Sequence, residues 1–245
     1  MNSLFLVLLA VFPQTWFSPE VLSGNTLSTF KNPLSLFYNP ALLPEKFSFF
    51  ATYSNPFRIR ELMTVKFALG ERGVAFGSSF LRSSGYIEGS LVFGFRKSIG
   101  MGHLGFALRG LFLEVEGFPI EKDLSLDLGF YVPYERFAIG GFLRDINTPR
   151  LANSPVPPSV DIAARDFLLK GVDFFVDLFH QSFHPLSVRV GQRWRIHPLL
   201  TVFAGASSYP PMVSFGFTLG KTPSFSFSLK EHPELGETRS ISVLW

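Results

Sequence analysis

Apolar and polar residues alternate with a period of two over most of the chain. In one segment, Leu124, Leu126, Leu128 and Phe130 share a face whose opposite side carries Asp, Ser and Gly. Side chains alternate between the two faces of a β-strand, so this pattern predicts β structure. The predicted strands are 46–54, 58–69, 73–82, 86–96, 103–114, 123–132, 135–144, 159–166, 171–179, 186–195, 199–206, 211–219, 223–230 and 237–245. Many approach the roughly 9–11 residues of a tilted transmembrane strand.

The breaks between these segments differ in length. Those after even-numbered segments are tight, as at Pro133-Tyr134 and His197-Pro198, while those after odd-numbered segments tend to be longer, up to 145–158. Outer-membrane barrels have this layout, with short turns at the periplasmic rim and long loops outside the cell. The sequence therefore predicts an all-β fold, a transmembrane antiparallel up-and-down β-barrel of about 14 strands over 46–245.

The composition suits a lipid-facing barrel. Charged residues make up 17% of the chain, which has 30 Phe, no Cys and a mean hydropathy of +0.26. A soluble β-sandwich or lipocalin-like barrel, the alternative, needs a water-shielded place for those Phe side chains. The net charge of +3 comes from dispersed residues, so no nucleic-acid partner is expected. Zero Cys excludes disulfides, thiolate metal sites and a Cys nucleophile.

The first 45 residues precede the predicted barrel. The apolar run 4–12 is too short for a spanning helix and lies where a signal peptide has its core. We expect a signal peptide over 1–23, with a retained N-terminal anchor as the alternative. Residues 24–45 are apolar and proline-rich, which favours an N-terminal hatch, or plug, inside the lumen over a periplasmic tail or linker.

The predicted inner face carries small residues and charges of both signs. The candidate lumen charge cluster is Arg109, Asp127, Arg144, Asp161, Arg165, Asp173, Asp177, Arg189 and Arg193. One interpretation is an ion-pair network that braces the barrel, because paired charges in a confined lumen stabilise each other. The other is a ligand or selectivity site, in which an arginine pair holds a carboxylate bidentately.

Enzyme motifs find little support in the sequence. His180 and His184 have a spacing that joins two imidazoles only on a helix, and they fall in a break between strands. There is no Gly-x-Ser-x-Gly elbow, and residues 94–100 do not end as a P-loop does. The segment 231–234 is interpreted as a turn. We therefore predict no catalytic residues, no metal site and no cofactor.

Three stretches resemble a known family. Asn39-Pro40-Ala41 precedes the first strand, Glu234-Leu235-Gly236 lies in the last turn, and residues 143–149 run into a proline-rich loop. Together with the fourteen segments they resemble the FadL-like and PorV/PorQ-type outer-membrane barrels. The resemblance implies a hatch motif at Asn39, Pro40 and Ala41, a closing hairpin at Glu234, Leu235 and Gly236, and location in the outer membrane of a Gram-negative-type bacterium.

Two functions are consistent with this resemblance. The first is hatch-gated transport of small hydrophobic molecules across the outer membrane. The second is a non-transporting barrel in a type IX-like secretion system, which binds or shuttles secreted protein cargo. The expected partners are outer-membrane lipid and either a small hydrophobic ligand or that cargo. A terminal aromatic, here Trp245, is also what such barrels offer the insertion machinery.

Overall fold

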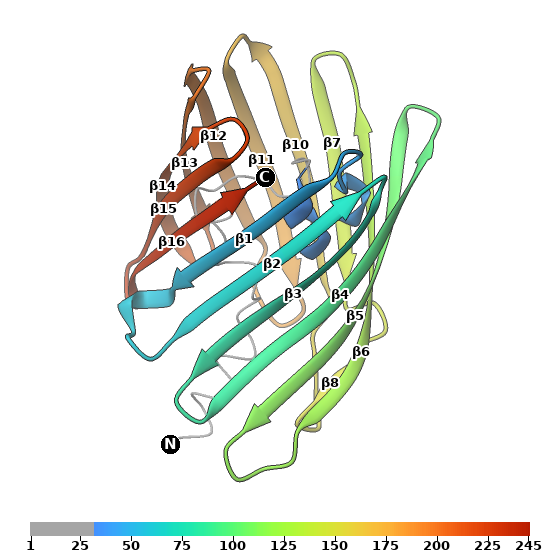
Figure 1. Cartoon of the computed structure of the whole chain (residues 1–245), viewed down its shortest axis with the longest axis vertical. Coiled ribbons are helices and arrows are strands. Elements are labelled where there is room, and N and C mark those ends of the chain that lie inside the picture. Colours follow the sequence, from blue (N-terminus) through green and yellow to red (C-terminus); the bar gives the residue numbers. More distant parts are fainter. Residues whose placement is uncertain (1–31) are drawn as a thin grey trace.

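The computed structural model describes residues 32–245, apart from the side chains of residues 167–169. Within this range, 14 antiparallel strands form one closed barrel (Figure 1). The strands are β1 (Ser48–Asn55), β2 (Met63–Glu71), β3 (Val74–Ser83), β4 (Tyr86–Ile99), β5 (Gly102–Val115), β6 (Glu121–Pro133), β7 (Phe137–Arg144), β10 (Ser159–Leu169), β11 (Val172–Gln181), β12 (Ser187–His197), β13 (Leu200–Ser208), β14 (Pro211–Gly220), β15 (Ser224–His232) and β16 (Gly236–Leu244). The predicted fold class is confirmed.

The barrel closes between its first and last strands. β1 pairs antiparallel with β16, in a register that places Phe50 opposite Leu244. Beyond β16, the backbone N–H of Trp245 donates to the Phe49 carbonyl oxygen at 2.8 Å, and the Phe49 N–H donates to the Trp245 carbonyl oxygen at 2.8 Å. Closure pairs the strand edges that long apolar strands would otherwise expose.

Each of the fourteen predicted segments overlaps one strand of the barrel. The largest shift is in the second, because residues 56–62 form the 3-10 turn η5 (Pro56–Arg58) and a bend before β2. Phe57 and Arg58 have φ values of 56° and 54°, a left-handed conformation that a strand does not accommodate. His180, predicted to lie in a break, is instead near the end of β11.

The two rims of the barrel differ. The turns after β2, β4, β6, β10, β12 and β14 contain two or three residues, and they lie at the end where β16 finishes, the upper end in Figure 1. The opposite rim carries the 145–158 loop, which contains the small hairpin β8 (Arg150–Leu151) and β9 (Ser154–Pro155). Three connections at this rim, 84–85, 209–210 and 233–235, are also of two or three residues, so the long loops are confined to part of it.

The two faces of the wall have opposite character. On β4, the outward-facing Leu91 and Phe93 are each 50% exposed, while the inward-facing Val92 is fully buried. A barrel in a bilayer presents such an apolar outer band. No helix in residues 32–245 is long and apolar enough to cross a membrane.

Candidate functional site

Residues 32–45, here called the inner segment, lie inside the barrel. They form two short 3-10 turns, η3 (Pro33–Phe37) and η4 (Pro40–Leu42). Each begins with an Asn-Pro pair: the Asn32 Oδ1 accepts from the Ser35 N–H at 3.1 Å, and the Asn39 Oδ1 accepts from the Ala41 N–H at 3.0 Å. Proline suits the first position of a helical turn because its φ is already helical and its missing N–H needs no partner there.

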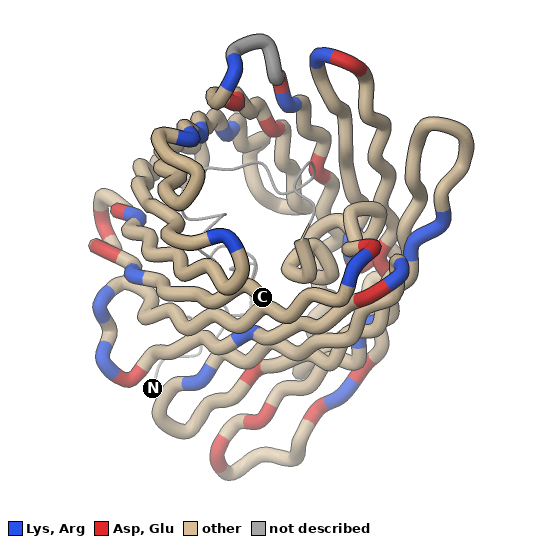
Figure 2. The backbone as a smooth tube through the Cα atoms, turned by 45° about the horizontal axis from the view of Figure 1, so that its top comes forward, with Lys and Arg blue, Asp and Glu red and all other residues tan. Residues whose placement is uncertain are grey.

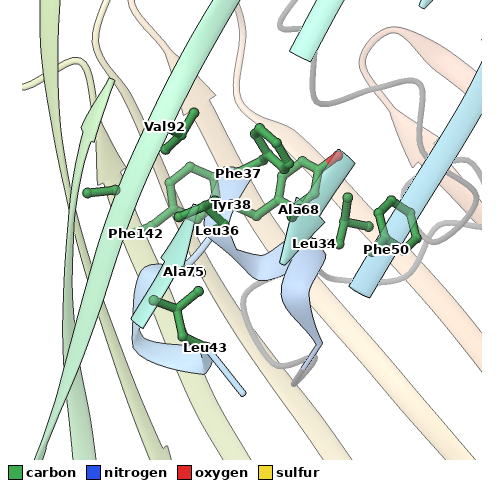
Figure 3. Packing of buried hydrophobic residues seen from close by; sticks show 11 residues of the cluster. Leu34, Leu36, Phe37, Tyr38, Leu43, Phe50, Ala68, Ala75, Val92 and Phe142 are labelled. Atoms are coloured by element: carbon green, nitrogen blue, oxygen red, sulfur yellow. The ribbon is translucent and has the colours of Figure 1, made fainter. Parts of the chain in front are cut away.

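The apolar side chains of the inner segment pack on the inner wall. Leu36 and Leu43, labelled in Figure 3, are fully buried, and Leu42 is also fully buried. Leu36 and Leu43 share a buried cluster with wall residues from the first half of the barrel, most of them small: Ala68, Ala75, Val92, Ala107, Phe50 and Phe142. Leu42 packs in a second cluster with Tyr131 and Ala138. Figure 2 shows the coiled segment against one side of the wall.

Glycines give the inner segment room at the wall. A Cβ added to Gly105 would stand 2.1 Å from the Ala41 backbone nitrogen, and one added to Gly129 would stand 2.1 Å from the Asn39 Oδ1. A Cβ at Gly94 would meet the Leu36 side chain at 2.6 Å. These contacts are closer than real Cβ atoms allow, so the inward glycines of β4, β5 and β6 form a seat for the inner segment.

Polar contacts fasten the inner segment at several points. The Asn39 Nδ2 donates to the Phe130 carbonyl oxygen at 2.9 Å, and the Arg144 guanidinium donates to the Phe37 carbonyl oxygen. The Lys66 Nζ donates to the Tyr38 hydroxyl at 3.3 Å. At the end of the segment, the backbone oxygens of residues 44 and 45 accept from the β2–β3 turn at 2.9 and 3.0 Å.

Only part of the N-terminal prediction falls within the described residues. The expected signal peptide, 1–23, and residues 24–31 of the expected hatch lie outside them. Residues 32–45, including Asn39, Pro40 and Ala41, lie on the inner wall as the geometry above describes. That this segment opens and closes the lumen stays a prediction.

The candidate lumen charges separate into three groups. The first joins β5, β6 and the end of β7. The Arg109 Nε lies 2.8 Å from the Asp127 Oδ2, and its Nη2 donates to Asp145. The Ser125 hydroxyl donates to the Asp145 Oδ1 at 2.6 Å, and the Arg144 Nε lies 3.9 Å from the Asp127 Oδ2.

Asp145 was not among the sequence-predicted residues. It follows β7 at the start of the longest loop, with a φ of 56°, and its side chain turns back into the lumen. Its backbone N–H donates to the Asp127 Oδ1 at 3.0 Å. Alternation ends where a strand ends, so the pattern gave no signal for a carboxylate that returns from a loop.

The second group lies on β10, β11 and β12. The Arg189 Nη1 lies 3.5 Å from the Asp177 Oδ2 and 3.8 Å from the Asp161 Oδ2. The Arg189 guanidinium also stacks over the Phe179 ring, 4.1 Å from its centroid. The strand register brings these side chains together, because Asp177 on β11 lies opposite Ala163 on β10 and opposite Arg189 on β12.

The third group surrounds Asp173, near the short-turn rim. The Arg193 Nε donates to the Asp173 Oδ2 at 2.6 Å, and the Arg165 Nη2 lies 3.3 Å from the same oxygen. Arg195, which was outside the predicted cluster, places its Nη2 at 3.9 Å from the Asp173 Oδ1. The charges named from the sequence thus meet in the lumen, but in three separate groups.

The rest of the inner wall is lined by hydroxyl groups. The side chains of Thr52 and Ser54 on β1 hydrogen-bond to Ser240 on β16, at 3.2 and 2.7 Å. Between β14 and β15, the hydroxyls of Thr218 and Ser226 are 2.7 Å apart. Unlike the buried residues under the inner segment, Thr218 and Ser226 are partly exposed.

The remaining predicted positions lie at the ends of strands. Glu234 and Leu235 form the turn between β15 and β16, where their N–H groups donate to the His232 Nδ1 at 3.1 and 3.2 Å, and Gly236 has a φ of 85°. Trp245 is 56% exposed beside β1. Among residues 32–245, no group of three or more His, Asp or Glu is placed to hold a metal ion.

Comparison with known proteins identifies the architecture. No family model matches the sequence, and no curated protein matches it either. A TodX monoaromatic hydrocarbon channel variant superposes with a TM-score of 0.69 at 9% identity, over 93% of this chain and 97% of the other. The chain has the fold of hydrocarbon channels.

Two further structures agree with this assignment of fold. The Ralstonia pickettii toluene transporter TbuX gives a TM-score of 0.63 at 12% identity, covering 96% of this chain and 98% of that one. The CymD monoaromatic hydrocarbon channel gives 0.62 at 11% identity, covering 93% and 96%. These FadL-family channels support the FadL-like part of the predicted resemblance. The PorV/PorQ part stays a prediction.

Proposed function

We propose that the protein is an outer-membrane channel for small hydrophobic molecules and that the inner segment is its gate. The observation that carries the proposal is the seating of this segment: an apolar stretch lies on an apolar inner wall inside a closed barrel. In this proposal the wide apolar band on the outside contacts lipid, and the short-turn rim faces the periplasm.

The wall beneath the inner segment indicates the kind of solute. Under the inner segment, the wall consists of Ala68, Ala75, Val92 and Ala107, bordered by two phenylalanines. Displacing the segment would uncover this surface to the lumen. Burying apolar surface is favourable by roughly 25 cal/mol per Å², so a hydrophobic solute would take the place of the leucines that leave. Toluene is the named solute of the TbuX and TodX transporters, which share this fold.

Uptake by whole cells tests the proposal. Gram-negative cells that express the chain in the outer membrane would take up labelled toluene faster than cells with an empty vector. The matched control is a barrel locked by a disulfide between Leu42→Cys of the inner segment and Ala138→Cys of β7, which share one buried cluster; the chain has no other Cys. Reduction should restore uptake if the segment is the gate.

Two results would contradict the proposal. Uptake equal to the vector control, with the barrel shown to be folded in the outer membrane, would exclude transport of this solute class. Uptake that is unchanged in the oxidised double-Cys variant, with the crosslink verified, would exclude gating by the inner segment. A stoichiometric protein companion without uptake would favour the secretion alternative.

A further inference from the structure

Positive charge recurs along the short-turn rim of the barrel. Four of the six short turns contain an exposed Lys or Arg, and two more exposed lysines lie beside them, one before β1 and one near the end of β4. These residues, here called the basic belt, are Lys46, Arg72, Lys97, Arg136, Lys170 and Lys221. In Figure 2, Lys and Arg positions are spread around this rim and are not gathered on one side of it.

Acidic residues at the same rim balance the basic belt only in part. The Glu45 carboxylate is already paired with Arg96, which is outside the belt. The Glu71 Oε1 lies 3.7 Å from the Arg72 Nε. The other acidic residues near the outside of these turns are Glu135 and Asp166. The outside of the short-turn rim therefore keeps an excess of positive charge.

The basic belt lies where the apolar outer face of the wall ends. Lys97 shares the outer face of β4 with Ile99, which is 54% exposed. Arg136 belongs to the turn between Tyr134 and Phe137, whose exposed rings stack with their centroids 4.4 Å apart. Exposed aromatic rings are typical of the interface between a bilayer and water. Long basic side chains lay their carbon stems on such apolar surface and extend the charged group toward the headgroups.

The long-loop rim has a different distribution of charge. Two of its arginines share one carboxylate, because the Arg58 Nη1 lies 3.9 Å from the Glu237 Oε2 and the Arg239 Nε is paired with the Glu237 Oε1. The exposed glutamates at this rim are Glu61, Glu114, Glu116, Glu121, Glu231 and Glu234. A partner that recognises positive charge therefore distinguishes the short-turn rim from the long-loop rim.

The spread of the basic belt favours one kind of acidic partner. A protein docks on one continuous patch, of about 800 Å² on each side in a typical complex. Lipid headgroups instead surround the whole circumference of a barrel. Anionic lipids attract basic residues close to the membrane surface, and the attraction falls off within a Debye length. Basic residues that recur from turn to turn, next to apolar wall, match a layer of anionic headgroups.

We propose that the basic belt is an interaction surface for anionic phospholipids in the leaflet at the short-turn rim. The belt rests on the proposed function only for the placement of the barrel in a bilayer. It adds a lipid partner that the transport of a solute does not require. The Lys and Arg side chains pair with the lipid phosphates, and the net negative charge of the lipid decides which lipids stay at this rim.

Native mass spectrometry of the full barrel tests the belt, after its release from nanodiscs with equal parts of phosphatidylglycerol and phosphatidylcholine. The lipids that stay bound should contain at least twice as much phosphatidylglycerol as phosphatidylcholine. A belt variant that combines Lys97→Gln, Arg136→Gln, Lys170→Gln and Lys221→Gln should retain the two lipids in nearly equal amounts.

The matched control removes the same charge from exposed positions at the long-loop rim. It combines Arg60→Gln, Arg82→Gln, Lys122→Gln and Arg150→Gln, and it should keep the preference of the native barrel. Heat-modifiable migration on a detergent gel shows that each variant is folded before its lipids are measured.

Three results would overturn the proposal: equal binding of both lipids by the native barrel, a preference that persists in the folded belt variant, or an equal loss of preference in the belt variant and the control. Toluene uptake does not involve the belt. Uptake by a barrel without lipid preference therefore refutes the belt alone, while lipid preference without uptake supports the belt and refutes only the transport.

Discussion

The Arg144 guanidinium donates a hydrogen bond to the main-chain oxygen of Phe37, which joins the end of β7 to the inner segment. The same side chain lies over the Phe142 ring, 5.3 Å from its centroid, and 3.9 Å from the Asp127 carboxylate. Arg144 thereby connects the first charge group, and through Asp145 the longest loop, to residues inside the lumen.

Loss of the Arg144 contact should loosen the inner segment without opening the barrel wall. A hydrogen bond from a charged group contributes about 1.5–3 kcal/mol, so Arg144→Met should populate a displaced segment far more often than the native chain does. Single-channel recording in planar bilayers should show more frequent opening events. Arg150→Met, at an exposed loop position, should show the same frequency of opening events as the native barrel. Identical traces for both variants would show that the contact does not hold the segment.

Glycine substitutions on one strand separate the seat from the wall itself. A Cβ at Gly105 would collide with the Ala41 nitrogen at 2.1 Å, whereas a Cβ at Gly110 on the same strand has its nearest neighbour at 4.0 Å. In a Leu42→Cys background, Gly105→Ala should expose the buried thiol to a maleimide reagent, and Gly110→Ala should leave it protected. The native chain has no Cys, so labelling reports only this position. Equal labelling in both variants would argue against the seat.

The first charge group should contribute strongly to barrel stability. Asp145→Ala leaves Arg109 with one carboxylate instead of two in a buried site, and breaking a buried ion pair costs about 3–5 kcal/mol. Urea unfolding in liposomes should therefore give a free energy of unfolding that is lower by about this amount. Glu121→Ala, at an exposed position on β6, serves as the control and should shift little. A shift no larger than the control's would mean that the group does not brace the barrel.

The proposed placement of the wall in a bilayer predicts a depth-dependent cost for charge. Phe93 lies on the outer face of β4, so Phe93→Arg should destabilise the folded barrel in liposomes by about 2–4 kcal/mol if it lies near the bilayer midplane. Phe118→Arg, in the loop 116–120 and 72% exposed, should cost close to nothing. Equal costs at the two positions would contradict a bilayer around β4.

Much of the architecture follows from the alternation of side chains. Fourteen segments with a period of two, separated by turns, predict strand number and face, and the barrel confirms both. The partners of inward residues were harder to foresee, because they depend on register and closure. Asp145 returns from a loop, and the Phe37 oxygen is a backbone group; neither leaves a mark in a side-chain pattern. The seat glycines were visible as small inward residues, but their purpose required the inner segment to be placed.

The position of the seat has a consequence for the order of assembly. Gly94, Gly105 and Gly129 belong to β4, β5 and β6, and the fastening residues Lys66 and Arg144 belong to β2 and β7. Apart from Leu244, which packs on the edge of the cluster, these contacts come from the first half of the sheet. The inner segment can therefore pack on an open, half-formed sheet before β16 pairs with β1 and the closed barrel surrounds the segment.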